Sequence, residues 1–128
     1  MHLSLPVSPG ELLDKLTILE IKSERMMDAA KLVNVRHELE LLRRTWAESP
    51  LAGCDVAALA GRLRQVNGAL WEIEDRIRLK EADGAFDAEF IELARSIYRN
   101  NDLRAAIKRE LNVALGSDLI EEKSYRTR

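Results

Sequence analysis

The chain has 128 residues, of which 46% are hydrophobic and 33% are charged, and its formal net charge is -2. This length favours one domain, spanning residues 1–128, with a hydrophobic core that needs no disulfide or structural metal. The composition argues against a disordered chain, and the nearly neutral charge excludes the strong basic field that is typical of nucleic-acid binding.

Capping residues mark the starts of the first two predicted helices. The segment "SPGE" is a capping box, in which Ser8 caps the helix and Glu11 reaches back to the amide of Ser8. This helix is predicted to run to about Met27. Asp28 then caps a second helix, which ends near Glu48, before the loop "SPLAGC".

Two longer helices are predicted to follow. Asp55 caps the third helix, which continues to the break around Gly84 in "ADGAF". Asp87 caps the fourth helix, and Gly116 supplies its left-handed end.

Apolar residues recur every three and four positions in the second and third helices. The repeat consists of Leu32, Val35, Leu39, Leu42 and Trp46, then Val56, Leu59, Leu63, Val66, Leu70, Ile73 and Ile77. This spacing favours nearly antiparallel helices, and no alternating β-branched run indicates a sheet. The sequence therefore predicts an all-α, single-domain four-helix antiparallel bundle, with the third and fourth helices the longest.

The tail "SDLIEEKSYRTR" is predicted to pack on this bundle. Its apolar side chains are Leu119, Ile120 and Tyr125. We expect them near Gly68 and Trp71, because an isolated apolar pair has little reason to remain in water. Gly61 and Gly68 each cost roughly 1 kcal/mol relative to Ala in a helix. They are either tolerated in a long helix or reflect close approach by the tail or another subunit.

Most signatures of catalysis or metal binding are absent from the sequence. It contains no Gly-rich phosphate loop, nucleophile elbow or CxxC pair. His37 and Glu40 are three residues apart, but no second Glu-x-x-His motif completes a di-iron site. An ExxD and an ExxE pair stand in the reverse of the order found in all-helical nucleotide pyrophosphatases, and they are interpreted as solvated faces. These pairs are Glu72 with Asp75 and Glu89 with Glu92. We expect no metal and no cofactor.

Localisation is predicted from what the N-terminus and the single cysteine, Cys54, indicate. The N-terminal segment lacks the basic and apolar regions of a signal peptide, and no apolar run is long enough to span a bilayer. One cysteine cannot form an intramolecular disulfide and fits a reducing compartment. We therefore expect a soluble, cytoplasmic protein.

Polar residues interrupt the apolar face of the fourth helix in "IYRNNDLRAAIKREL". On a helical wheel, Asn101, Arg104 and Lys108 lie within the same arc as the apolar residues. The first helix is apolar over most of its circumference, yet it places Lys15 and Lys22 on one stripe. Cations directed at a core are costly unless they are paired, so this polar seam needs an explanation.

Three explanations of the seam remain open from the sequence. The fourth helix can break at Asn100–Asp102, or it can stay intact with its cations neutralised by Glu38, Glu74 or Asp75. Alternatively, the seam is a pocket that binds an anionic small molecule, with Arg104 as a fork and lysines as point charges. A pocket would store unpaired charge, so replacing Arg104 by Leu would not destabilise the protein. A structural ion pair would make that replacement cost about 3–5 kcal/mol.

Five segments combine in a specific way: "SPGELLDKLTILEIKSER", "LVNVRHEL", "VNGALWEIEDRIR", "FDAEFIELARSIYRNNDLRAAIKREL" and "GSDLIEEKSY". Through them the chain resembles a bacterial family of small helical proteins of unknown function. The resemblance implies neither an activity nor catalytic residues. It implies that such domains also occur beside glycosyltransferase or tetratricopeptide-repeat modules, which links them to cell-surface polysaccharide synthesis.

The first predicted function is a non-catalytic module that binds an anionic small molecule and is accessory to polysaccharide synthesis. Its predicted ligand-binding residues are Lys15, Lys22, Asn101, Arg104 and Lys108. One alternative is a metal-free enzyme, similar in architecture to all-helical chorismate mutases, which bind a dicarboxylate through Arg and Lys. The other is a protein-interaction adaptor. The expected partner is an anionic small molecule or another protein, without nucleic acid or a membrane span, and the sequence leaves homodimer formation open.

Overall fold

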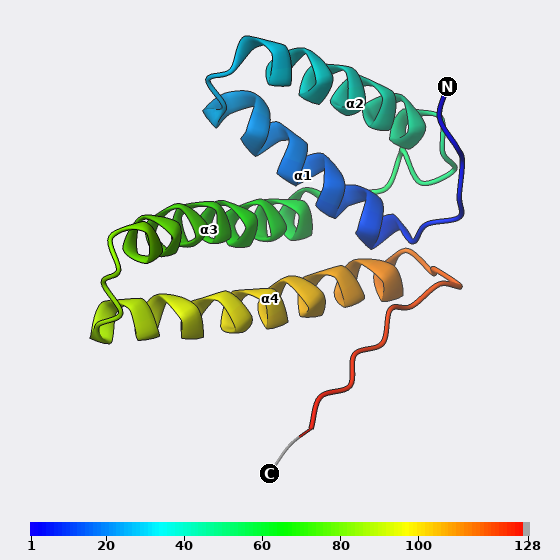
Figure 1. The fold of residues 1–128 in the computed structure, drawn as a ribbon. Helices are drawn as coiled ribbons and strands as arrows, with labels where there is room; N and C mark the ends of the chain where they lie inside the picture. The colour runs from blue at the N-terminus through cyan, green and yellow to red at the C-terminus, as the bar shows by residue number, and fades with distance from the viewer. Residues whose placement is uncertain (127–128) are drawn as a thin grey trace.

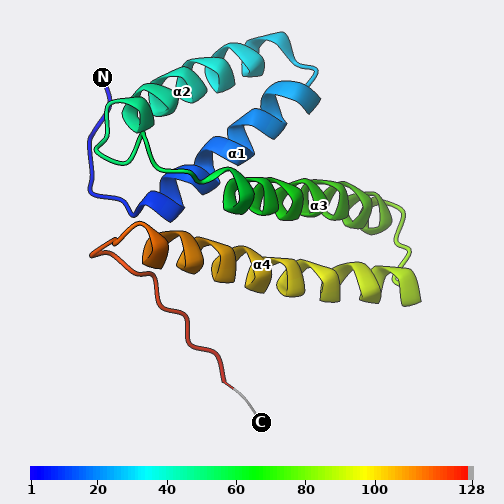
Figure 2. The ribbon, with the colours of Figure 1, turned by 180° about the vertical axis from the view of Figure 1, so that it is seen from behind.

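The computed structural model describes residues 1–126, and that part of the chain contains four α-helices and no strand. They are α1 (Pro9–Arg25), α2 (Ala29–Ala47), α3 (Ala57–Ala82) and α4 (Ala88–Ala114). The helices form two antiparallel hairpins, and α1 lies between α2 and the α3–α4 hairpin (Figure 1). The view from behind shows the same order (Figure 2). The predicted all-α fold is confirmed.

Side-chain caps begin three of the four helices as predicted. Ser8 accepts from the amide of Glu11 at 3.1 Å, Asp28 from Lys31 at 3.0 Å, and Asp87 from Phe90 at 3.0 Å. At α3 the cap position belongs to Val56, and the carboxylate of Asp55 accepts from the amide of Ala57 at 3.1 Å. The local capping chemistry was therefore predicted to within one residue.

Helix α4 continues without a break through Asn100–Asp102. The Asn100 amide donates to the carbonyl of Ser96 at 2.8 Å, four residues earlier, and so stays within the helix. The explanation of the polar seam by a helix break is wrong. The helix ends at Ala114, and Gly116 has a φ of 68°, as predicted. With 26 and 27 residues, α3 and α4 are longer than α1 and α2.

The apolar core gathers around α1, which is buried over most of its circumference. The buried apolar side chains are Leu12, Leu13, Leu16, Leu19, Ile21, Leu39, Leu63, Leu93, Ile107 and Leu111. They come from all four helices, so the hydrophobic repeats meet at α1. None of the helices in the described residues is long and apolar enough to cross a membrane.

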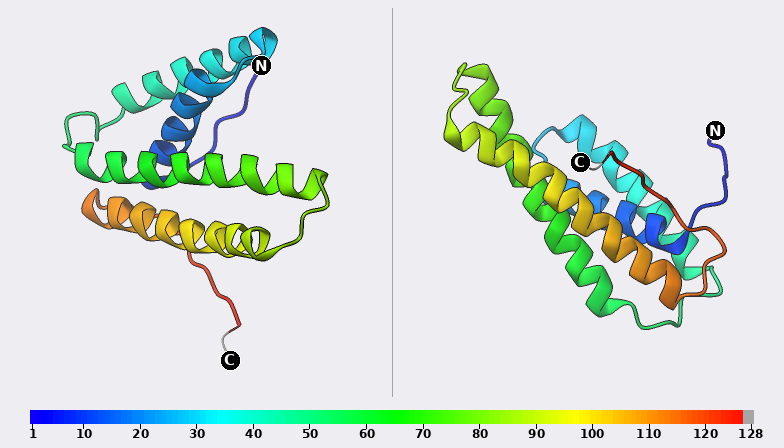
Figure 3. Two further views of the ribbon diagram at one scale, coloured as in Figure 1. Left: turned by 90° about the vertical axis from the view of Figure 1, so that its left-hand side faces the viewer. Right: turned by 90° about the horizontal axis from the view of Figure 1, so that it is seen from below.

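The C-terminal tail contacts α4 through two charged side chains, and of its three apolar side chains Ile120 is half-buried. Glu121 pairs with Lys108 at 3.2 Å and Glu122 pairs with Arg109 at 3.0 Å, both on α4. Beyond these pairs the tail extends away from the helices (Figures 1 and 3). The tail hydrophobics Leu119 and Tyr125 stay exposed, so their predicted burial is wrong.

The predicted docking place of the tail, at Gly68 and Trp71, is also wrong. Apart from the adjacent residues and backbone of its own helix, a methyl group at Gly68 would have one neighbour within 4 Å in the described residues, Arg25 Nη2 of α1, and a methyl group at Gly61 would have none. These glycines are therefore not required by close packing within the chain. The tail lies on α4 instead because its two carboxylates find cations there.

Candidate functional site

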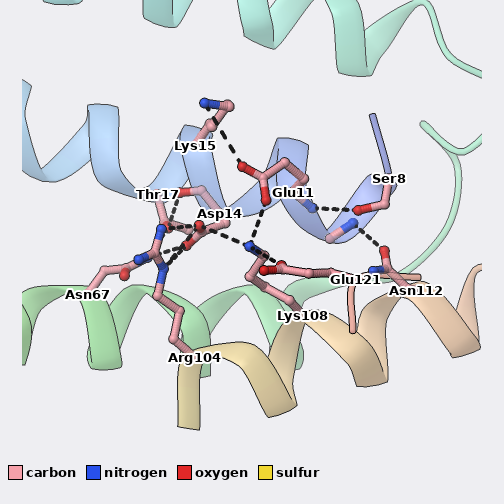
Figure 4. Close-up of polar contacts among 11 residues, drawn as sticks. Ser8, Glu11, Asp14, Lys15, Thr17, Asn67, Arg104, Lys108, Asn112 and Glu121 are labelled. Atoms are coloured by element: carbon pink, nitrogen blue, oxygen red, sulfur yellow. Dashed lines mark hydrogen bonds and ion pairs between the residues drawn. The ribbon is translucent and has the colours of Figure 1, made fainter. Parts of the chain in front are cut away.

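The centre of the polar seam is a buried carboxylate on α1. Asp14 is fully buried, and Arg104 of α4 forms a bidentate hydrogen-bonded ion pair with it (Figure 4). Arg104 Nε donates to Oδ1 at 2.9 Å and to Oδ2 at 3.0 Å, while Nη2 donates to Oδ2. This planar arrangement is the strongest form of ion pair between these residue types.

Helix α3 completes the surroundings of this carboxylate. Asn67 Nδ2 donates to Asp14 Oδ1 and to Thr17 Oγ1, each at 2.9 Å. The hydroxyl of Thr17 in turn donates to the carbonyl of Asp14 at 2.8 Å. No buried side-chain nitrogen or oxygen of the described residues lacks a partner, so the network is satisfied.

A second cation of α4 lies one turn further along. Lys108 Nζ contacts Glu11 at 2.6 Å, Glu121 at 3.2 Å and Asp14 at 3.8 Å. The predicted capping box is therefore only half formed. Ser8 caps the helix, but the carboxylate of Glu11 pairs with Lys108 instead of accepting a hydrogen bond from the amide of Ser8. The side chain of Lys108 is only 12% exposed, and a largely desolvated cation gains more from a carboxylate than a terminal amide does.

Close approach of the backbones brings α1 onto α4 at this point. The amide of Gly10 donates to Asn112 Oδ1 at 2.7 Å. A methyl group at Gly10 would lie 2.6 Å from the carbonyl oxygen of Lys108, so only glycine fits here without a shift. This contact positions Glu11 and Asp14 over the cations of α4.

The environment keeps both cations protonated. The hydrogen bond to Asp14 is the main reason why the pKa of Arg104 is raised above its ordinary value, and it outweighs the opposing effect of burial. Burial is the largest single influence on Lys108 and lowers its pKa. The hydrogen bonds to Glu11 and Glu121 and the charges of Asp14 and Glu11 together exceed that influence, so the pKa of Lys108 is raised.

The structure brings three of the five predicted ligand-binding residues together. Asn101, Arg104 and Lys108 line a pocket of about 240 Å³, which we call the cation pocket. Its remaining lining residues are Glu11, Ala105, Glu121 and Lys123. The other two do not line this pocket: Lys15 is 54% exposed and lies 4.0 Å from Glu11, and Lys22 is half-buried.

The expectation that the seam stores unpaired cations is wrong, since Arg104 and Lys108 both have carboxylate partners. Those partners come from α1 and the tail, not from Glu38, Glu74 or Asp75. The prediction that carboxylates neutralise these cations is thus correct, but the carboxylates that it named are wrong.

Sequence reasoning missed Asp14 and Asn67, although the signal that revealed Arg104 was present for both. Asp14 shares a helical stripe with Ile21, which is buried, and Asn67 lies one turn after the buried Leu63. A search of every helix for polar residues inside an apolar stripe identifies both Asp14 and Asn67.

Fold and site together define an all-helical protein whose core contains a hydrogen-bonded ion-pair network joining three helices. The chain belongs to a family of unknown function (DUF6165), whose sequence model matches residues 3–128. This confirms the resemblance to an uncharacterised family. No curated protein and no solved structure matches the chain. In the described residues no group of three His, Cys, Asp or Glu side chains could hold a metal ion.

Proposed function

We propose that the protein is a non-catalytic module that binds an anionic small molecule in the cation pocket. The observation that carries the proposal is the carboxylate of Glu121, which already occupies an anion position at 3.2 Å from Lys108. This carboxylate comes from the tail rather than from the bundle. A phosphate or carboxylate group of a ligand can therefore take its place without moving a helix.

The remaining contacts of Lys108 favour such an exchange. Glu11 and Asp14 belong to α1, and they hold and orient the ammonium whether or not the tail is present. Glu121 is 51% exposed, and exposed ion pairs contribute at most about 1 kcal/mol. A multiply charged ligand would thus displace a weak competitor from a cation that is already oriented.

Arg104 adds a second, oriented donor group. Its Nε and Nη2 are committed to Asp14, whereas Nη1 donates no hydrogen bond within residues 1–126. Because the guanidinium is fixed by a buried carboxylate, a ligand oxygen at Nη1 costs little side-chain entropy. The amide of Asn101 and the ammonium of Lys123 line the same pocket and complete a polar binding surface.

The proposal includes a cytoplasmic location and an accessory role in cell-surface polysaccharide synthesis. The free thiol of Cys54 is exposed, which suits a reducing compartment. The family resemblance suggests the link to polysaccharides. Phosphorylated sugars are therefore the first ligands to try.

The test is a thermal-shift panel with glucose 1-phosphate, UDP-glucose and malate. We expect at least one probe to raise the Tm of the wild-type protein, because a ligand that binds only the folded state stabilises it. Lys108→Met should abolish this shift. Arg62→Met should retain it, because it removes an equal charge from an exposed pair with Glu110 outside the pocket.

No shift with any probe, or equal shifts in both variants, would overturn the proposal. Circular dichroism on Lys108→Met establishes that the variant is folded before its response is interpreted. Turnover of a stabilising probe would replace the binding module by the metal-free enzyme.

A further inference from the structure

A second pocket, of about 330 Å³, lies on the other side of Arg104. It shares Asn101 and Arg104 with the cation pocket and opens between α1, α3 and α4. Its apolar lining residues are Ile18, Leu70 and Trp71. Its polar lining also includes the carboxylates of Glu74 and Asp75 and the amide of Asn67. We call this cavity the acceptor pocket.

The side-chain amide of Asn67 contributes an oxygen atom that has no partner within the described residues. Asn67 is only 5% exposed, and its Nδ2 donates to the carboxylate of Asp14 and the hydroxyl of Thr17. The opposite amide orientation would set oxygen against an ionised carboxylate, which can only accept, so the assignment of the two atoms is fixed. Figure 4 shows the oxygen directed away from Asp14. Within residues 1–126 it accepts no hydrogen bond, and since no buried side-chain oxygen there lacks a partner, this oxygen reaches solvent. Asn67 lines the acceptor pocket, so a ligand in the pocket can use the oxygen as an acceptor.

The carboxylates of the pocket give it negative charge that the protein leaves partly uncompensated. Asp75 forms no ion pair within residues 1–126, and Glu74 contacts only Arg78, whose side chain is 80% exposed. Arg104 contributes little opposing charge, because the buried carboxylate of Asp14 neutralises it. The pocket therefore presents acceptors and net negative charge to its contents.

The indole of Trp71 lines this pocket and is partly open to solvent. Trp71 is half-buried, and the tail, which was expected to shield it, lies on α4 instead. An aromatic face beside carboxylates is the arrangement that attracts organic cations.

We propose that the acceptor pocket binds the ammonium group of an organic amine. The ammonium donates to Asn67 Oδ1, and the apolar part of the amine packs on Trp71 and Leu70. The negative charge of Glu74 and Asp75, two turns further along α3, attracts the ammonium to the pocket. A neutral alcohol could use the same acceptor, but it gains nothing from the net charge, so the pocket favours the amine. The proposal does not rest on the proposed anion binding: the two pockets share Asn101 and Arg104, but Lys108 lines the cation pocket and not this one.

The test uses benzylamine and, as its neutral counterpart, benzyl alcohol. The chain has two tryptophans, so in Trp46→Phe the fluorescence reports Trp71 alone. We expect saturable quenching by benzylamine and at least tenfold weaker binding of benzyl alcohol. Asp75→Asn should weaken amine binding several-fold, whereas Glu81→Gln, an equal charge loss at an exposed position of α3 outside the pocket, should leave it unchanged.

Because Trp46 packs against the core, calorimetric titration of benzylamine into the wild-type protein gives the same comparison without that substitution. Equal affinity for the amine and the alcohol, equal effects of Asp75→Asn and Glu81→Gln, or no binding of benzylamine would each overturn the proposal. Amine binding that survives in Lys108→Met separates this site from the cation pocket.

Discussion

Arg104 and Asp14 form the one ion pair on which the site depends. Asp14 is fully buried, so Arg104→Leu removes its hydrogen-bonded cation and leaves Lys108, at 3.8 Å, as the remaining one. We expect this change to lower the free energy of unfolding by about 3–5 kcal/mol, the range for breaking a buried pair on one side. Urea denaturation measures it.

The double variant Asp14→Leu/Arg104→Leu separates the pair from simple loss of packing. We expect it to be more stable than the sum of the two single changes predicts, because it leaves no stranded charge. Additive losses, or a loss below about 1 kcal/mol for Arg104→Leu, would show that the pair is not structural.

Gly10 provides a second prediction at the scale of one residue. Gly10→Ala should destabilise the protein, because the new methyl group would lie 2.6 Å from the backbone oxygen of Lys108 and force α1 away from α4. Gly61→Ala is the matched control, since beyond its own stretch of α3 the methyl group meets no atom within 4 Å in the described part of the chain. It should stabilise α3 by up to about 1 kcal/mol. Thermal melts that rank both variants on the same side of wild type would disagree with this account.

The site was only half predictable from the sequence, for a reason that these residues illustrate. A helical wheel shows that Arg104 and Lys108 face the core, because that property depends on neighbours within one helix. It does not show that Arg104 meets Asp14, 90 positions earlier, because that depends on how α1 crosses α4. Glu38, which was considered as a partner, is exposed on α2, the helix that packs on α1 alone.

At the scale of elements, the helices were predicted because their signals are local. Asp28 and Asp87 cap the helices that directly follow them, and Gly116 ends α4. The tail has no such signal. Its position depends on Lys108 and Arg109, which a helical pattern identifies only as cations.

The turn between α3 and α4 carries a pH-dependent contact. Lys80 of α3 pairs with Asp87 at 2.7 Å and with Glu89 at 3.2 Å. These hydrogen bonds to Lys80 are the main reason why the pKa values of Asp87 and Glu89 are lowered. A lowered carboxyl pKa stabilises the folded state above the ordinary value of about 4, and the gain is lost as the pH falls through the lowered values.

Lys80→Met should therefore melt at a lower temperature than the wild-type protein at pH 7. The difference should narrow as the pH falls towards 2, because protonation of the two carboxylates removes their attraction to Lys80. Thermal melts at the two pH values provide the measurement. An equal difference at both values would mean that Lys80 stabilises the turn by packing rather than by charge.

At the scale of the whole molecule, α1 organises both the core and the polar network. It lies between α2 and the α3–α4 hairpin, and it carries the two carboxylates, Glu11 and Asp14, that hold the cations of α4 (Figures 1 and 4). The cation pocket and the acceptor pocket meet at Arg104. A fixed guanidinium thus divides two cavities of different charge.

The measurement that tests the central claim most directly is a calorimetric titration of Glu121→Gln with glucose 1-phosphate. If Glu121 occupies the anion position on Lys108, its neutralisation removes a competitor. The affinity should then rise by up to about fivefold, which corresponds to roughly 1 kcal/mol for an exposed pair. Glu122→Gln, which removes the neighbouring charge from Arg109, should bind like the wild-type protein. Equal affinities in all three proteins, or no binding in any of them, would contradict the account.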